Sequence, residues 1–231
     1  KPISLTLEDA KEMIAATEAA GVFFQMWFQR RFDAGYMAAK QKLDAGAIGD
    51  PVMFTSISRD PFAPPIEFCD PRMSGGLIAD MGAHDFDAAR MYMGEVARVH
   101  AIGGTLAYPE MKSVGDIDNA VIDLVFQSGG LGVVQFSRNA VYGYDIRGEL
   151  WGTKGSIQIG YDRMTPLLMF TRDGITHGAV DLQHVHAVHA GGGQAKRLAP
   201  FGDIQAGGDP VQVAGRVAVA LGVDRIHQRG R

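Results

Sequence analysis

From residue 96 onward the sequence predicts short strands joined by tight turns, and this run constrains the fold more than any other feature. Gly-containing segments at 127–130 and 152–155 lie between apolar-rich segments and are typical of hairpins. The predicted strands cover residues 96–106, 120–126, 131–138, 145–151 and 156–159, with 167–171 as a further edge strand. Successive strands joined in this way form an antiparallel sheet, and a helical layer on one face would bury it.

Residues 75–94 predict the helix that packs across this sheet, with Gly94 as its C-terminal cap. Two apolar stripes follow the helical period: Leu77, Met81, Ala88 and Tyr92, and Ile78, Gly82, Phe86, Ala89 and Met93. A narrow polar strip of Asp80, His84 and Asp87 separates them. Because Asp80 and His84 are four residues apart, their side chains are expected to meet. Two interpretations stay open, a functional carboxylate–imidazole pair and a surface helix pair worth about 0.2–0.5 kcal/mol.

The N-terminal part of the chain predicts a helix followed by a buried strand. Thr6 is a suitable N-cap, and Gly21 ends the helix. Residues 22–28 are continuously apolar apart from Gln25, which is typical of a strand buried on both faces. A helix that leads directly into such a strand is typical of the end of a parallel α/β unit.

The segment between these two regions predicts a short helix, a strand and a long loop. Asp33 caps a helix that reaches Gly46, and residues 52–58 predict a strand. The proline-containing connection that follows is too long for a simple turn, so we expect it to be a functional loop.

Composition excludes several classes of protein. The 231 residues carry a net charge of −4 without basic clusters, which argues against nucleic-acid binding. No apolar run approaches the ~20 residues of a membrane span, and no signal peptide is visible. Cys69 is the single cysteine, so an internal disulfide is excluded and a cytoplasmic location is expected. The chain does not begin with Met, so we expect a fragment or a processed product.

Residues 176–231 lack the regular pattern of the preceding sequence. They are rich in Gly, Ala, Val and His, and only residues 211–223 predict a helix. Three imidazoles at His184, His186 and His189 have a spacing that could ligate zinc or nickel, but no cysteine or carboxylate completes the set. We therefore predict no metal site.

Five short motifs, in this order, resemble one family of oxidoreductases. They are Lys1-Pro2, the segment from Gln29 to Asp33, Ser58-Arg59-Asp60-Pro61, the pair Asp80 and His84, and Tyr142-Gly143-Tyr144-Asp145. Over residues 1–175 the chain resembles the glucose-fructose oxidoreductase / inositol dehydrogenase superfamily, above all its inositol 2-dehydrogenase branch. Members pair an N-terminal Rossmann domain with a C-terminal antiparallel-sheet domain.

The resemblance implies three parts in this chain. Residues 1–28 would be the last helix and strand of the dinucleotide-binding Rossmann domain, and 29–175 an α+β substrate-binding and oligomerisation domain with helices on one face. Residues 176–231 do not resemble the family, and we expect them to be an atypical tail, disordered or partly helical. No Gly-x-Gly-x-x-Gly follows a strand, so the phosphate-binding turn of a Rossmann domain is missing.

The resemblance also implies an activity, the oxidation of a secondary alcohol of myo-inositol or a related cyclic polyol with hydride transfer to NAD, NADP not being excluded. His84 would be the base and Asp80 would orient its imidazole, while Lys1 would contact both the reacting oxygen and the cofactor. Arg30, Tyr144 and Asp60 would hold substrate hydroxyls.

Several alternatives stay open at this point. Arg30 could instead pair with Asp33, and only one of Tyr142 and Tyr144 is expected to face the substrate. The chain could belong to another sugar oxidoreductase of the superfamily, or be a non-catalytic domain that only self-associates. Because the Rossmann turn is missing, we expect the isolated chain to be inactive with NAD.

Both faces of the predicted sheet carry apolar residues. Ile122, Leu124 and Phe126 alternate with Val121 and Val125, and Val133 with Val134 repeats the pattern. With helices on one face only, the other would expose a large apolar patch. We therefore expect a homodimer or homotetramer, with Val121, Val125 and Val133 in the contact.

Overall fold

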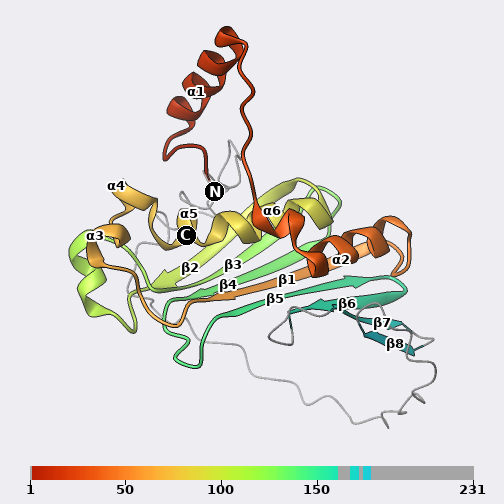
Figure 1. The fold of residues 1–231 in the computed structure, drawn as a ribbon. Helices are drawn as coiled ribbons and strands as arrows, with labels where there is room; N and C mark the ends of the chain where they lie inside the picture. The colour runs from red at the N-terminus through yellow and green to blue at the C-terminus, as the bar shows by residue number, and fades with distance from the viewer. Residues whose placement is uncertain (1, 161–166, 172–173, 178–231) are drawn as a thin grey trace.

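One mixed sheet covered by helices on one face forms the centre of the molecule (Figure 1). The computed structural model describes residues 2–160, 167–171 and 174–177. The strand order is β2-β3-β4-β1-β5-β6-β7-β8. The strands are β1 Pro51–Arg59, β2 Val96–Gly104, β3 Asn119–Phe126, β4 Leu131–Ser137, β5 Asp145–Gly152, β6 Gly155–Ile159, β7 Leu167–Thr171 and β8 Gly174–His177. The predicted α+β architecture is confirmed.

The central strand β1 departs from the antiparallel pattern. It pairs antiparallel with β5 but parallel with β4, with Met53 opposite Leu131 and Arg59 opposite Ser137. All other neighbouring strands are antiparallel. Because β1 and β4 run in the same direction, their carboxyl ends meet at one edge, where Asp60 N donates to Ser137 O at 2.9 Å.

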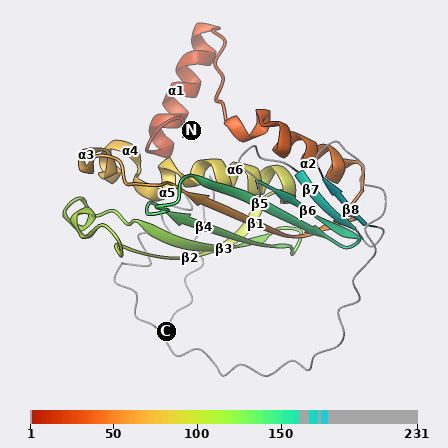
Figure 2. The same cartoon turned by 60° about the horizontal axis from the view of Figure 1, so that its bottom comes forward.

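The helices lie on one side of the sheet (Figures 1 and 2). They are α1 Leu7–Ala20, η1 Gln29–Phe32, α2 Ala34–Asp44, α3 Ile66–Cys69, α4 Pro71–Ser74, α5 Gly76–Asp80, α6 Gly82–Met93 and the 3₁₀ turn η2 Pro109–Val114. The caps predicted at Thr6, Gly21 and Asp33 are confirmed. Each cap is set by nearby residues, as when Thr6 Oγ1 accepts from Asp9 N.

The segment predicted as one helix over 75–94 is two helices, separated at Met81. The apolar stripes are buried as predicted, against Phe54, Ile122, Leu124, Val134 and Phe136 of the sheet. Gly82, directly after the break, lies close against aromatic rings of the core. A Cβ added at Gly82 would come within 2.8 Å of the Phe86 ring and 3.1 Å of Phe136.

The prediction of a buried strand at 22–28 is wrong for this structure. Val22, Phe23 and Trp27 are 57%, 89% and 63% exposed, and the described residues provide no strand that pairs with the segment. A strand is stabilised by its neighbours, so the apolar sequence alone does not produce one.

The connection after β1 is more regular than predicted, since it contains the short helices α3 and α4. Cys69 is buried, and Asp70 accepts from Arg72 N to cap α4. Lys1, the three histidines at 184, 186 and 189, the predicted helix at 211–223 and most of the tail lie outside the described residues.

The second face of the sheet carries no helix in the part of the chain that the structure describes (Figure 2). Val121 is 46% exposed there, and Ile102, Leu131 and Trp151 are 49%, 52% and 45% exposed. None of the described helices has the length and apolar character that a bilayer-spanning helix requires.

Candidate active site

Asp80 and His84 lie on either side of the α5–α6 junction. The side chain of Asp80, the last residue of α5, is 12% exposed. His84, in the first turn of α6, is partly buried, and its Nε2 lies 3.3 Å from Gln29 Nε2. The Phe28 ring meets the imidazole edge-on, with 6.5 Å between ring centroids. The imidazole is therefore held from the η1 side by an amide and an aromatic ring.

Three successive residues of η1 each contact a residue of the first turns of α6. Gln29 contacts His84, Arg30 contacts Asp85, and Arg31 contacts Asp87 through a two-pronged ion pair. We call these three contacts the η1 clamp. The clamp fixes α6 relative to η1, so the position of His84 does not depend on its own hydrogen bond alone.

The middle contact of the η1 clamp is a buried ion pair. Arg30 Nη1 lies 2.5 Å from Asp85 Oδ1, and the two side chains are 7% and 0% exposed. Burial lowers the pKa of Arg30, but the charge and hydrogen bond of Asp85, together with Tyr36 and Tyr92, outweigh it, so the pKa is raised above its ordinary value. Ser56 and Ser58 on β1 donate to Asp85 at 2.5 and 2.9 Å. These bonds offset the cost of burying two charges.

The alternative pair of Arg30 with Asp33 does not form. Asp33 instead accepts from the backbone N–H groups of Gly35 and Tyr36 at the start of α2. The guanidinium of Arg30 makes its contacts inside the protein, with Asp85, Ser56 and Ser58. This geometry favours a role in positioning His84, and contact with substrate stays a prediction.

The two tyrosines of the β4–β5 connection differ in their surroundings. Tyr142 Oη donates to Asp145 Oδ2 at 2.8 Å and accepts from Arg59 Nη1 at 3.0 Å. These three residues lie on the open face of the sheet. Tyr144 lies in the connection just before β5 and is 69% exposed. Tyr144 thus stays the candidate for substrate contact.

Asp60 is fixed through its backbone at the joined ends of β1 and β4. Its N–H donates to Ser137 O, and its carbonyl accepts from Ala140 N at 2.9 Å. These bonds attach the loop after β1 to the connection that carries Tyr144. The structure does not describe Lys1, so its predicted role is not tested.

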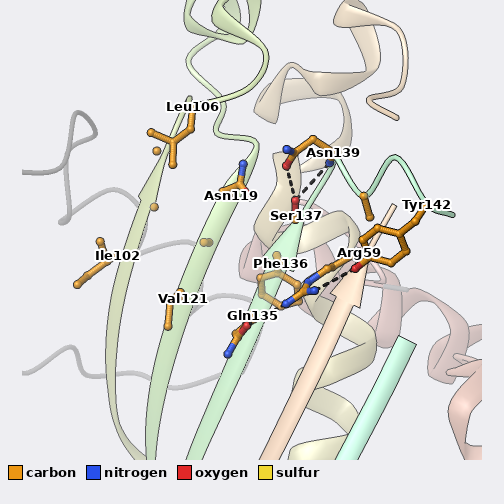
Figure 3. A pocket seen from close by; sticks show the side chains of 14 residues that line it. Arg59, Ile102, Leu106, Asn119, Val121, Gln135, Phe136, Ser137, Asn139 and Tyr142 are labelled. Carbon is orange, nitrogen blue, oxygen red and sulfur yellow. Dashed lines mark hydrogen bonds between the residues drawn. The ribbon is translucent and has the colours of Figure 1, made fainter. Parts of the chain in front are cut away.

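A hollow of about 450 Å³ lies on the open face, away from the helices (Figure 3). Arg59, Gln135, Asn119 and Tyr142 are among its polar lining residues. The Arg59 guanidinium is already engaged by Tyr142, Asp145 and Gln135. Asp80, His84 and Tyr144 are not among the residues that line this hollow, so it is separate from the candidate site.

Sequence reasoning missed Gln29, Asp85 and Arg138 as parts of this region. Asp85 is fully buried beside His84, and Arg138 Nη2 lies 3.5 Å from Asp80 Oδ2. One signal was available. Ser56 and Ser58 share the inward side of β1 with Phe54, and polar residues at such positions need buried polar partners.

The described residues do not form a cofactor or metal site by themselves. A nicotinamide dinucleotide is held by a Gly-rich turn between a strand and a helix N-terminus, and no such unit occurs among residues 2–160. Within the described ranges, no group of three His, Cys, Asp or Glu side chains is placed to bind a metal ion.

Comparison with known proteins identifies the family. Residues 36–158 match the model of the GFO/IDH/MocA C-terminal domain. The chain belongs to this family. It is 44% identical over 175 residues to myo-inositol 2-dehydrogenase of Thermotoga maritima, covering 75% of this chain and 52% of that protein. It is also 44% identical over 161 residues to scyllo-inositol 2-dehydrogenase (NAD(+)) of Bacillus subtilis, covering 69% and 46%.

Solved structures of the family have the same fold. Myo-inositol dehydrogenase from Corynebacterium glutamicum superposes with a TM-score of 0.64 at 31% identity, over 69% of this chain and 47% of that one. Levoglucosan dehydrogenase in complex with NADH and levoglucosan superposes with a TM-score of 0.68 at 27% identity, over 77% and 52%. The chain spans about half the length of the curated relatives it matches.

Proposed function

We propose that this chain is the substrate-binding part of an oxidoreductase that oxidises a secondary alcohol of myo-inositol or a related cyclic polyol with NAD. The observation that carries the proposal is the η1 clamp, which fixes His84 beside the end of α5 where Asp80 lies. The names of the inositol 2-dehydrogenase relatives, and the NADH in the levoglucosan dehydrogenase complex, support the reaction class and the cofactor.

His84 is the proposed general base, which takes the proton of the reacting hydroxyl. An imidazole with an ordinary pKa near 6.5 is well suited to this step near neutral pH. Gln29 lies against Nε2, so an incoming hydroxyl would share or replace that contact. Asp80 is the proposed carboxylate that orients the ring and stabilises its charged form.

Tyr144, Asp60 and Arg30 are the proposed substrate-binding group, and Lys1 is the proposed donor to the reacting oxygen and cofactor. Support for Tyr144 and Asp60 comes from the joined ends of β1 and β4, where both loops meet. When bound, NAD would accept the hydride from the substrate carbon. Because the described residues lack a dinucleotide cradle, we derive only the proton transfer and substrate contacts from this chain.

The proposal can be tested by supplying a dinucleotide-binding domain. The chain would be fused to the N-terminal half of the Thermotoga maritima relative, which the match does not cover. We expect the fusion to reduce NAD with myo-inositol or scyllo-inositol, and the 231-residue chain alone to show no useful turnover. His84→Asn should lower kcat by about 10²–10⁴-fold. His100→Asn, which changes an exposed histidine that lies beside Asp123, is the matched control.

The substrate panel includes levoglucosan because of the structural likeness to levoglucosan dehydrogenase. Turnover of levoglucosan but no inositol would assign the chain to another sugar oxidoreductase of the family. A folded fusion that turns over no polyol, or whose activity survives His84→Asn, would contradict the proposal and favour a domain that only self-associates.

A further inference from the structure

A second buried arginine lies behind Asp80. Arg138 follows β4 directly and has the largest of the fully buried side chains in the part of the chain whose burial is described. Its Nη2 lies 3.5 Å from Asp80 Oδ2, and its Nη1 lies 3.4 Å from Cys69 Sγ. Its Nε has no hydrogen-bond partner among the described residues. Arg138 therefore connects the end of β4 to both α3 and α5.

The backbone on both sides of Arg138 is fixed. Arg138 N donates to Asp118 O, and the preceding Ser137 O accepts from Asp60 N, both at 2.9 Å. Ser137 and Asn139 line the hollow on the open face (Figure 3). Arg138, between them, makes its contacts on the side that carries the helices, as strand alternation requires.

A buried guanidinium stays charged, so it needs an anion to offset its desolvation. Two other buried carboxylates of this region already bind backbone N–H groups. Asp118 accepts from the N–H groups of residues 106–108, and Asp116 accepts from Leu77 N. Asp80 forms an ion pair with Arg138.

The two buried arginines differ in how closely they hold their carboxylates. Arg30 lies 2.5 Å from Asp85, and two serines complete that network. Arg138 lies 3.5 Å from Asp80, which is longer than the 2.7–2.9 Å of a strong charge-assisted bond. The Arg30 pair has the geometry of a structural ion pair, whereas the Arg138 contact with Asp80 is longer and weaker.

We propose that Arg138 is a positioning residue that holds the Asp80 carboxylate charged and oriented for its action on His84. This inference rests on the proposed function of Asp80 and His84. Arg138 acts through Asp80 and does not touch the substrate. Its charge also balances part of that of Asp80, so Arg138 limits how strongly the oriented carboxylate stabilises the imidazolium and keeps the titration midpoint of His84 from rising too far for a base.

The test follows the titration of His84 by NMR in the full 231-residue chain with labelled histidines, its signals being assigned by comparison with His84→Asn. The polar and charged side chains on the elements around His84 are Asp80 on α5, Gln29 on η1 and, on α6, Asp85 and Asp87 with their partners Arg30 and Arg31. The contacts of Gln29, Asp85 and Asp87 join η1, α6 and β1 and do not include Arg138, so a shift reports on Arg138 and on the Asp80 carboxylate that it contacts.

We expect Arg138→Met to raise the titration midpoint of His84 by about one pH unit, because the unbalanced carboxylate favours the imidazolium. Arg138→Lys, which keeps the charge, should reverse most of this shift. Cys69→Ala is the matched control, since it removes the other side-chain contact of Arg138 and leaves the charge beside Asp80. A midpoint unchanged in Arg138→Met, or moved equally in Cys69→Ala, would overturn the proposal.

A second measurement decides the matter if Arg138→Met does not fold. Asp80→Asn keeps the shape of residue 80, and we expect it to shift the Nε–H signal of Arg138; an unmoved signal would also overturn the proposal. Adding myo-inositol to the unmodified chain separates the two claims. If inositol perturbs His84 but Arg138→Met does not, only the role of Arg138 fails. If Arg138→Met shifts the His84 titration but inositol does not perturb His84, the polyol function fails and the coupling of Arg138 to His84 stands.

Discussion

Two stacked tyrosines beside the η1 clamp use their hydroxyl groups differently. Tyr92 Oη donates to Tyr36 O at 2.8 Å, whereas Tyr36 Oη is buried without a hydrogen-bond partner among the described residues. Burial raises the pKa of Tyr36 to about 12, so the hydroxyl stays neutral. We expect Tyr36→Phe to raise the free energy of unfolding by about 1 kcal/mol, since it removes a buried polar atom that has no partner. Tyr92→Phe should lower it by a similar amount, and urea denaturation would measure both. Equal losses in the two variants would show that Tyr36 Oη is bonded.

The hydrogen bonds of the buried Asp118 carboxylate predict a contribution to stability that is lost in acid. Burial raises the pKa of its carboxyl, but the N–H groups of Leu106, Tyr108 and Ala107 and the Asn119 amide outweigh it, so the pKa is lowered. A lowered pKa in the folded state stabilises the protein above the unfolded value of about 3.9, and this contribution is lost as the pH falls through the folded value. We expect the unfolding free energy of Asp118→Asn to be lower at neutral pH and less dependent on pH below about 4. Parallel curves for the variant and the unmodified chain would contradict this.

Local residue patterns predicted what local contacts determine. The caps at Thr6 and Asp33 bond within three residues, and the spacing of Asp80 and His84 brings both to the α5–α6 junction. The partners of Asp85 and Arg138 are 27 to 69 residues away, so no neighbouring sequence signals them. Ser56 and Ser58 occupy alternate positions of β1 that face the core, and this predicts only that some buried polar partner exists.

At the scale of the element, the start of α5 depends on Gly76. Its φ is +70°, and an added Cβ would lie 2.3 Å from Asp116 Oδ1, the carboxylate that accepts from Leu77 N. Gly46 has a similar φ of +71° with open space around it, so Gly46→Ala measures the cost of the backbone strain without a steric clash. We expect Gly46→Ala to lower the unfolding free energy by about 1–2 kcal/mol, and Gly76→Ala to lower it by roughly a further 1–3 kcal/mol. Thermal or urea unfolding would compare them, and equal losses would mean that Asp116 moves aside without cost.

Strand pairing was predictable only where a tight turn sets it. The β3–β4 and β5–β6 hairpins match the turn signals at 127–130 and 152–155. The parallel contact of β1 with β4 joins segments about 80 residues apart, and no local pattern reports it. The segment at 22–28 shows the converse, since an apolar run typical of a strand remains unpaired within the described chain.

At the scale of the whole molecule, the two faces of the sheet have different roles. The face covered by α5 and α6 forms the core and supports the candidate site. On the open face, strand register places Ile102 beside Val121, and Val121 beside Gln135. Val133 lies two residues before Gln135 on the same face of β4, opposite Asp123. Apolar residues thus lie beside charged and polar ones on this face.

We expect two copies of the chain to pair through this open face, with Val121, Val125 and Val133 in the contact. The described residues put no helix over it, and a two-fold arrangement would cover both copies at once (Figure 2). Val121→Glu should weaken the association, since a carboxylate placed in the interface loses its hydration without gaining a partner. Met37→Glu, at a 43% exposed position on α2, is the control and should leave association unchanged. Sedimentation at micromolar concentrations would distinguish dimer from monomer in each variant. A monomeric unmodified chain, or equal dissociation in the two variants, would show that this face does not pair.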